Sequence, residues 1–312
     1  MAAELLAADH SAPVEGGPLV SMIMATNRVS PFLREALDSI TRQSYPDVEI
    51  IVVDDGCPDR VALAEQLGRF PGLVVVRQRA SGVSVARNVG IDRARGALVG
   101  FFDDDDRYPP DWVEQHVRAH TELPEVTLTY GDVRSIDADG RLLGLDVSRQ
   151  ADLHDIFRRD VAVFAGSMVV RRDALVRVGG FSPLLRYAED LDLVLRLALQ
   201  GPLRHVAGAV MDYRTHADNV TRGHRELVAA IGDVIDWHRA AALRAGRDDL
   251  VRDLATSRAA NGRFAFWSAQ RVARTELRSG GTAAAVRELL WAVRAAPTAP
   301  LSWLRKRLGR RS

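Results

Sequence analysis

The sequence predicts an α/β fold with a doubly wound, mostly parallel sheet flanked by helices, followed by an α-helical C-terminal region. Short, continuous apolar runs alternate with segments of helical periodicity through the first half of the chain, which is the pattern of successive βαβ units. Several of these runs end in polar or acidic residues. A change to alanine- and arginine-rich sequence after residue 222 predicts the helical region.

Each element follows from its local sequence. The apolar runs are of the kind that is buried on both faces of a parallel sheet; they span residues 19–24, 48–53, 73–76 and 98–102. Helices are predicted between them at residues 31–43, 60–67 and 83–94, with Ser30 as an N-cap. A helix at 173–178 that ends at a glycine and a strand at 206–213 follow. The C-terminal helices are expected at residues 226–245, 250–277, 282–295 and 301–308.

The composition is that of a folded globular chain, with 47% hydrophobic and 27% charged residues among 312. We expect a flexible N-terminus at 1–18, an α/β domain at 19–221 and a helical region at 222–312. The single cysteine, Cys57, has no partner for an internal disulfide and fits a reducing compartment. Neither a signal peptide nor a stretch of ~20 apolar residues is present, so a cytoplasmic location is expected.

Charge is distributed unevenly along the chain. Residues 222–312 hold 18 basic and 8 acidic residues, a net charge of +10, which leaves −9 for residues 1–221. Such a basic region is suited to an anionic surface, either a membrane or a phosphorylated acceptor. Residues 301–311, with five basic and no acidic residues between apolar anchors, resemble an interfacial helix. Solvated helix faces and a frayed terminus are the alternatives. No nucleic-acid partner is expected.

Acidic and polar residues follow three of the predicted strands, at 25–28, 54–56 and 103–106. The carboxyl ends of parallel strands meet at one edge of a sheet, where such folds bind ligands. Carboxylates brought together repel one another, and a hard divalent cation such as Mn²⁺ or Mg²⁺ commonly relieves that repulsion. Neither a glycine-rich dinucleotide fingerprint nor a P-loop is present, which argues against a nicotinamide enzyme and a nucleoside triphosphate hydrolase.

Four motifs occur in a specific order. They are VSMIMATNR at 20–28, EIIVVDDG at 49–56, GVSVARNVG at 82–90 leading to FDDDD at 102–106, and GGF at 179–181 followed by EDLDL at 189–193. Together they resemble glycosyltransferase family 2, whose members have the GT-A fold. The resemblance covers roughly residues 19–221, which are therefore expected to be the catalytic domain. It implies inverting transfer of a sugar from a nucleoside-diphosphate sugar, UDP- or dTDP-linked, to an acceptor hydroxyl.

The resemblance also implies roles for individual residues. Those expected to bind the nucleotide-sugar are Thr26, Asn27, Asp54, Arg87, Asp103 and Asp104. Asp105 and His216 are expected to ligate Mn²⁺ or Mg²⁺, which would offset charge on the departing diphosphate. Asp190 is the expected general base, and Glu189 is expected to help place the acceptor. If the chain stays extended after the fourth strand, Asp103 and Asp105 point to the same side.

Each of these residues also has an alternative, purely structural interpretation. The aspartate run could form a solvated turn, Asp54 could form an Asx turn or a helix cap, and Arg87 could form an ordinary ion pair. Asp190 would cap a helix, and His216 would have only a structural role. Asp55 is the more structural member of its pair, and the glycines at 179 and 180 are expected to serve the backbone alone.

The sequence departs from the family pattern in two places. The usual aromatic residue between Thr26 and Asn27 is missing, which leaves the identity of the base open, and the Q-x-x-R-W element of processive synthases is absent. The second departure favours a single, non-processive addition. A sugar nucleotidyltransferase and an inactive scaffold recruited to membranes are the alternative functions. The acceptor, whether a glycan, a lipid-linked sugar or a small natural product, is not predicted.

Overall fold

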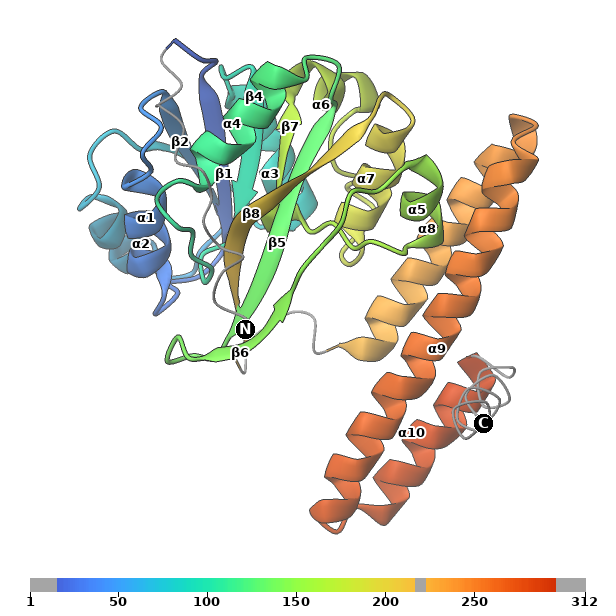
Figure 1. Cartoon of the computed structure of the whole chain (residues 1–312). Coiled ribbons are helices and arrows are strands. Elements are labelled where there is room, and N and C mark those ends of the chain that lie inside the picture. Colours follow the sequence, from blue (N-terminus) through green and yellow to red (C-terminus); the bar gives the residue numbers. More distant parts are fainter. Residues whose placement is uncertain (1–15, 217–222, 296–312) are drawn as a thin grey trace, which may run out of the picture. The chain divides into compact units, whose positions relative to one another are not determined.

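The computed structural model describes residues 16–216 and 223–295. Contacts between Cα atoms divide the chain into two units, residues 1–156 with 161–217, and residues 157–160 with 218–312. The first unit holds the sheet and its helices, and the second is helical (Figure 1). The predicted class, a mostly parallel sheet flanked by helices and followed by a helical region, is confirmed.

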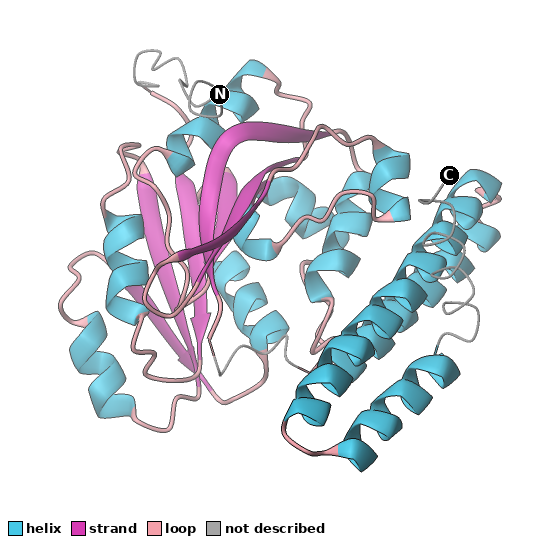
Figure 2. Ribbon diagram, turned by 60° about the horizontal axis from the view of Figure 1, so that its bottom comes forward, coloured by secondary structure: helices cyan, strands magenta, loops and turns pink. Residues whose placement is uncertain are grey.

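The sheet has eight strands in the order β3-β2-β1-β4-β7-β5-β6, with β8 also paired to β5. Strands β1 to β4 are parallel to one another, β7 is antiparallel to β4 and β5, and β8 is parallel to β5. Figure 2 shows these strands between helices. Their bounds are β1 Val20–Thr26, β2 Val48–Asp55, β3 Val74–Gln78, β4 Leu98–Phe102, β5 Leu128–Ile136, β6 Leu142–Asp146, β7 Met168–Arg171 and β8 Leu203–Arg214.

Helices cover both faces of the sheet. Alternate β1 residues Val20, Met22 and Met24 pack in one core cluster with residues of α1 and α4, while Ile23 points to the opposite face. There Gly90 of α3 brings the helix close to β1, since a Cβ on Gly90 would lie 2.3 Å from Ile23 Cγ2. The helices are α1 Leu33–Thr41, α2 Arg60–Leu67, α3 Val83–Arg93, α4 Trp112–Glu122, α5 Leu153–Arg158, the 3₁₀ turn η1 Ala165–Ser167, α6 Arg172–Val178 and α7 Glu189–Ala198.

Two local predictions need correction, and the start of one further helix bears on the site. Strand β3 is not buried on both faces: it is the edge strand, and Val74 and Val75 are 41% and 50% exposed. Helix α1 begins at Leu33, two residues later than expected, because Ser30 forms a turn that accepts a hydrogen bond from Phe32 N at 3.2 Å. Helix α7 begins at Glu189, so both Glu189 and Asp190 lie in its first turn.

The second unit contains α8 His224–Arg244, α9 Asp248–Arg278 and α10 Thr282–Ala295. Asn261 Nδ2 of α9 donates to Val228 O of α8 at 2.9 Å. Glu288 of α10 contacts His224 and Arg225 of α8, at 3.1 and 2.6 Å. Among the described residues no helix has the length and apolar content to cross a membrane. The helix expected at 301–308 and the flexible N-terminus expected at 1–18, up to residue 15, fall outside the described residues.

Candidate active site

The ends of β1, β2 and β4 lie side by side at one edge of the sheet. In the strand register Thr26 pairs with Asp54, and Met24 pairs with Phe102, the residue before the aspartate run. The polar residues that follow the three strands therefore share the edge that the sequence predicted. Strand β8 ends at Arg214, two residues before His216, and the bridge between Arg107 and Asp212 ties this strand to the segment after β4.

The chain does not stay extended after β4. Asp104 and Asp105 form a turn, so the condition under which Asp103 and Asp105 were expected to point to the same side is not met. The side chains instead have separate partners. Asp103 contacts Arg87, and Asp105 contacts His216. The turn thus distributes neighbouring carboxylates among different cations and donors.

Thr26 and Arg28 of the first turn hold the aspartates from the β1 side. Thr26 Oγ1 donates to Asp104 Oδ2 at 2.5 Å. Arg28 Nη2 donates both to Asp104 Oδ1 at 3.0 Å and to Asp105 Oδ2 at 2.8 Å. Asn27, between them, is exposed. The turn after β1 therefore meets the aspartate turn directly.

His216 lies against the same carboxylate. Its Nε2 is 2.9 Å from Asp105 Oδ2, and its ring is 5.2 Å from the ring of Phe32. Arg214 fixes the segment, because its Nε donates to Asp105 O at 2.9 Å and its guanidinium lies 4.5 Å from the Phe32 ring. Asp106 Oδ1 accepts a hydrogen bond from the Arg214 backbone at 2.9 Å. The end of β8 is thus anchored on the aspartate turn.

Burial and mutual repulsion disfavour the charged form of two carboxylates in the turn, Asp105 and Asp106. Burial raises the pKa of Asp105, and the charges of Asp103 and Asp104 raise it further, while His216 and Arg28 lower it. Burial and the charges of Asp103 and Asp105 also raise the pKa of Asp106 well above its ordinary value. Such groups would gain from a cation placed beside them.

Arg87 of α3 connects the aspartate run to α7. Its Nη2 donates to Asp103 Oδ1, and its Nη1 donates to Glu189 Oε1, both at 2.9 Å. The side chain is buried, and its guanidinium lies 5.3 Å from the Phe181 ring centroid. Despite burial, the charges of Asp103 and Glu189 raise its pKa. Arg87 therefore stays charged and orders two carboxylates that are far apart in the sequence.

The same face of α3 holds the segment that leads into α7. Asn88 accepts from Phe181 N and donates to Phe181 O, both at 2.8 Å, and Ser84 Oγ donates to Leu185 O at 3.0 Å. Gly180 is left-handed, with φ of +68°, and a Cβ there would lie 2.4 Å from Asn88 Oδ1. The glycine therefore serves close backbone approach.

Asp190 sits in the first turn of α7. Burial, and then the charge of Glu189, raise its pKa to about 7, although a hydrogen bond from Leu191 N at 2.7 Å and the charge of Arg87 oppose that rise. Ala188, just before the helix, has a left-handed backbone with φ of 58°, a conformation that costs energy for a residue with a Cβ. The backbone thus turns sharply where the two carboxylates are presented.

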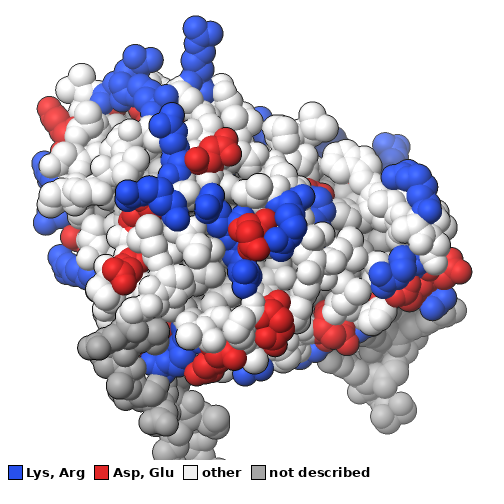
Figure 3. Space-filling view, turned by 90° about the horizontal axis from the view of Figure 1, so that it is seen from above, with Lys and Arg blue, Asp and Glu red and all other residues white. Residues whose placement is uncertain are grey.

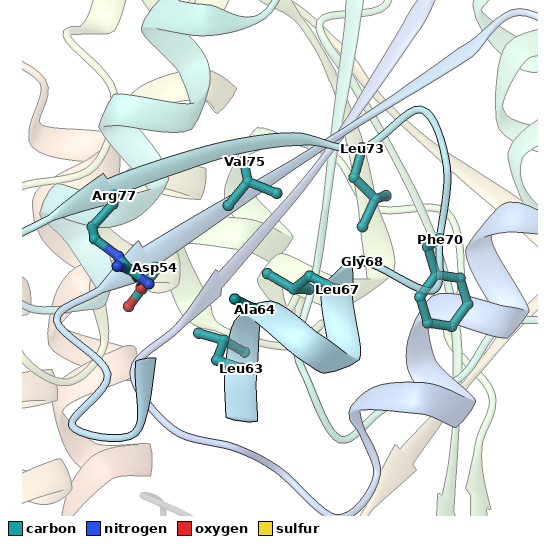
Figure 4. Close-up of a pocket in the computed structure, with 9 residues that line it drawn as sticks. All are labelled: Asp54, Leu63, Ala64, Leu67, Gly68, Phe70, Leu73, Val75 and Arg77. Carbon is teal, nitrogen blue, oxygen red and sulfur yellow. Dashed lines mark hydrogen bonds and ion pairs between the residues drawn. The ribbon is translucent and has the colours of Figure 1, made fainter. Parts of the chain in front are cut away.

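Asp54 lies beside a hollow of about 320 Å³ (Figure 4). Asp54 is buried; its Oδ1 accepts from Cys57 N and its Oδ2 accepts from Arg77 Nε, both at 2.7 Å. Arg77 also lines the hollow, and the rest of the wall is apolar and comes from α2, β3 and the loop between them. Its remaining residues are Leu63, Ala64, Leu67, Gly68, Phe70, Leu73 and Val75. Asp55, in contrast, accepts from the backbone of Ser81 and Gly82, both at 2.8 Å.

Sequence reasoning assigned no role to three arginines at this edge, Arg28, Arg77 and Arg214. Each contacts an acidic residue or the backbone of the aspartate turn. For Arg28 the available signal was its place in the first motif, and for Arg214 it was its place beside His216. The contacts themselves join positions up to 109 residues apart, which no local pattern specifies.

The residues present fit a divalent metal ion in part. Asp105 and His216 are adjacent, one offering oxygen and the other an imidazole nitrogen, and both ligand types suit Mn²⁺. Burial and the charges of Asp103 and Asp104 raise the pKa of Asp105, so a cation beside this carboxylate would favour its charged form. Among the residues that the structure describes, no group of three or more His, Cys, Asp or Glu is gathered as a metal cluster.

The mostly parallel sheet, flanked by helices and with acidic residues after its strands, has the GT-A type of fold. The profile of "Glycosyl transferase family 2" matches residues 21–189, and the chain belongs to that family. The chain is 46% identical over 91 residues to the "Uncharacterized glycosyltransferase EpsJ" of Bacillus subtilis, covering 28% of this chain and 26% of the relative. It is 29% identical over 204 residues to the "Putative glycosyltransferase EpsH" of the same organism, covering 64% and 56%. The chain thus spans about a quarter to just over half of these relatives.

A solved structure with a similar fold is the mannosyltransferase PcManGT of Pyrobaculum calidifontis in complex with GDP-Man and Mn²⁺. The TM-score is 0.60 at 21% identity, over 96% of this chain and 83% of that one. At this identity the likeness concerns the fold. The family membership and the glycosyltransferase class therefore rest on the sequence profile and the curated relatives.

Proposed function

We propose that the chain is an inverting, metal-dependent glycosyltransferase that moves one sugar from a nucleoside-diphosphate sugar to an acceptor hydroxyl. The observation that supports this most is the bridge made by Arg87. It joins Asp103, in the acidic turn at the carboxyl edge, to Glu189, the neighbour of Asp190. A donor-binding turn and a candidate base are thereby held in one ionic network.

The donor would lie along the edge formed by β1, β2 and β4. Asp54, at the polar end of the hollow, would accept a hydrogen bond from the base, with apolar contact from the wall beside it. UDP and dTDP have an imide N–H that a carboxylate can accept from. Thr26, Asn27, Asp103 and Asp104 would contact the ribose and diphosphate region.

Asp105 and His216 would hold Mn²⁺ or Mg²⁺. Such an ion, when bound, offsets negative charge on the diphosphate as it departs. The protein's own part is to keep the two ligands together, and Arg214 does so through its hydrogen bond to Asp105 O. The homologous fold solved with Mn²⁺ agrees with this proposal.

Asp190 would take the proton from the acceptor hydroxyl while that oxygen attacks the anomeric carbon from the face opposite the leaving diphosphate. A pKa of about 7 suits this role, because a base is most effective when its pKa is near the working pH. Glu189, fixed by Arg87, would orient the acceptor. One base and no covalent intermediate are needed.

We also propose that the helical region contacts an anionic membrane surface. Val286, Leu289, Leu290 and Val293 of α10 form a stripe at i, i+3, i+4 and i+7 that is 38–52% exposed. Arg287 and Arg294 are exposed on the same helix. Apolar and basic residues on one exposed helix suit an interfacial position, and the net charge of +10 on residues 222–312 adds attraction. The face drawn in Figure 3, by contrast, shows both signs of charge interspersed.

A thermal-shift panel tests the donor proposal. UDP-, dTDP-, GDP- and CDP-sugars would each be added with Mn²⁺, since a ligand that binds the native state raises the melting temperature. We expect the largest rise with a UDP- or dTDP-sugar, and transfer to an acceptor with inverted configuration. Release of pyrophosphate from a nucleoside triphosphate and a sugar phosphate would instead identify a nucleotidyltransferase. No stabilisation by any nucleotide sugar would support the inactive scaffold.

A further inference from the structure

We propose that Arg28 is an exchangeable counter-ion: it neutralises Asp104 and Asp105 in the free protein and transfers its guanidinium to the donor's diphosphate when a metal ion reaches Asp105. The inference rests on the proposed function and adds to it a donor-binding residue that the sequence did not assign. It starts from a single nitrogen, Arg28 Nη2, which lies 3.0 Å from Asp104 Oδ1 and 2.8 Å from Asp105 Oδ2.

Arg28 and His216 meet at one oxygen atom. Asp105 Oδ2 accepts from Arg28 Nη2 and lies 2.9 Å from His216 Nε2. A metal ion held by Asp105 and His216 would therefore have Arg28 as its immediate neighbour. Two cations at one carboxylate oxygen repel each other, so the metal and the guanidinium compete for Asp105.

Arg28 is free to leave while its surroundings stay in place. Its side chain is 35% exposed, whereas those of Asp104 and Asp105 are 7% and 12% exposed. Asp104 keeps a second hydrogen bond, from Thr26 Oγ1 at 2.5 Å. The same hydroxyl oxygen accepts from the backbone N–H of Arg28, at 3.5 Å, which ties the turn to this side chain. A rotation about the side-chain bonds of Arg28 is sufficient for the exchange.

The diphosphate of the donor is a suitable second partner. A guanidinium binds phosphate oxygens through two parallel N–H groups, and it stays charged at any working pH. Once the metal has neutralised Asp105, Arg28 has lost a carboxylate partner and the incoming diphosphate offers a replacement. Metal and diphosphate should therefore bind cooperatively, and each should bind weakly without the other.

Calorimetric titration with MnCl₂ alone, and then with UDP, dTDP, GDP and CDP at saturating Mn²⁺, tests this exchange in the full chain. We expect Arg28→Ala to bind Mn²⁺ alone about tenfold more tightly than the wild type, since the metal then has no charged hydrogen bond to displace at Asp105. The nucleotide that binds the wild type should bind Arg28→Ala at least about tenfold more weakly. Arg28→Lys, which keeps the charge but not the fork, should fall between them.

Arg34→Ala is the matched control, because Arg34 is an exposed arginine on α1 that forms an ion pair with Asp38, at 3.8 Å. It should match the wild type in both titrations. Equal Mn²⁺ affinity in wild type and Arg28→Ala, including no measurable binding in either, would overturn the exchange. So would unchanged nucleotide affinity in Arg28→Ala. If no nucleotide binds the wild type, the proposed function fails, while the titration with Mn²⁺ alone still decides whether Arg28 competes with the metal.

Discussion

Arg87 Nη1 donates to Glu189 Oε1 at 2.9 Å, across 102 positions of sequence. The bond places the first turn of α7 against α3, and the other arm of the same guanidinium reaches Asp103. A carboxylate next to the candidate base and a carboxylate of the acidic turn therefore depend on one buried cation. Disturbing Arg87 should affect both sides of the site together.

The pH dependence of turnover should change when Arg87 is replaced. The charge of Arg87 lowers the pKa of Asp190, so Arg87→Ala should raise that pKa and move the acid limb of the kcat profile to higher pH, by roughly one unit. Arg93→Ala, an exposed arginine on the same helix, should leave the limb in place. The measurement is kcat against pH for the three proteins. If the acid limb of the profile lies at the same pH in Arg87→Ala and the wild type, the pKa of Asp190 does not determine that limb.

Removing the metal ligand should abolish donor binding and transfer together. Asp105→Ala should lose Mn²⁺-dependent nucleotide binding, and its melting temperature should not fall, because the pKa of Asp105 is raised by burial and by neighbouring negative charge. Asp139→Ala, at an exposed aspartate, provides the control. Full activity of the wild type in excess chelator would contradict the metal dependence.

The first unit should lose stability at acidic pH through two buried histidines of α4. Burial lowers the pKa of His120 to about 4 and that of His116 well below 6.5. Between pH 6.5 and the lowered pKa values, the unfolded chain therefore binds more protons than the folded chain. The free energy of unfolding keeps its full value above pH 6.5 and decreases as the pH drops towards 4. His120 alone should account for about 3 kcal/mol. Chemical denaturation of wild type and His120→Gln at several pH values measures this, and equal pH slopes would refute it.

The sequence was a good guide wherever a short segment determines its own structure. All four predicted strands of the first half form, as do the helices between them, because apolar runs and helical periodicity are local signals. The convergence of Thr26, Asp54 and the aspartate run at one edge followed from the parallel topology. Strand β3 was misjudged because an apolar run does not reveal that it lies at the edge of a sheet.

Contacts between side chains that are distant in the sequence could not be predicted from it. The turn at Asp104 and Asp105 depends on Thr26 and Arg28, 76 to 78 positions away. The roles of Arg28 and Arg214 arise only when β1, β4 and β8 are brought together. The domain boundary expected between residues 221 and 222 stays a prediction, although the chain divides nearby, after residue 217. The roles assigned to the site residues also stay predictions.

Membrane contact should depend on the exposed stripe of α10. Leu290→Glu should weaken binding to vesicles that contain anionic lipid, because it places a charge where an apolar side chain would be buried. Higher salt should weaken the wild type as well. Val176→Glu, at an exposed apolar residue of α6, is the matched control. Deletion of residues 301–312, which lie outside the described residues, should also lower binding. Unchanged vesicle binding in both altered proteins would favour solvated helix faces.

The assignment of Asp190 as general base is tested most directly by Asp190→Asn, which keeps the size of the side chain and removes its basicity. Turnover and calorimetric donor affinity would be measured for wild type and variant at the same Mn²⁺ concentration. General-base assistance is typically worth about 10²–10⁴ in rate, so turnover should fall at least 10²-fold, while donor affinity should hardly change. Near-normal turnover, or a donor affinity that collapses with turnover, would contradict the assignment. The role would then pass to Glu189 or to Asp192, a third acidic residue in the first turn of α7.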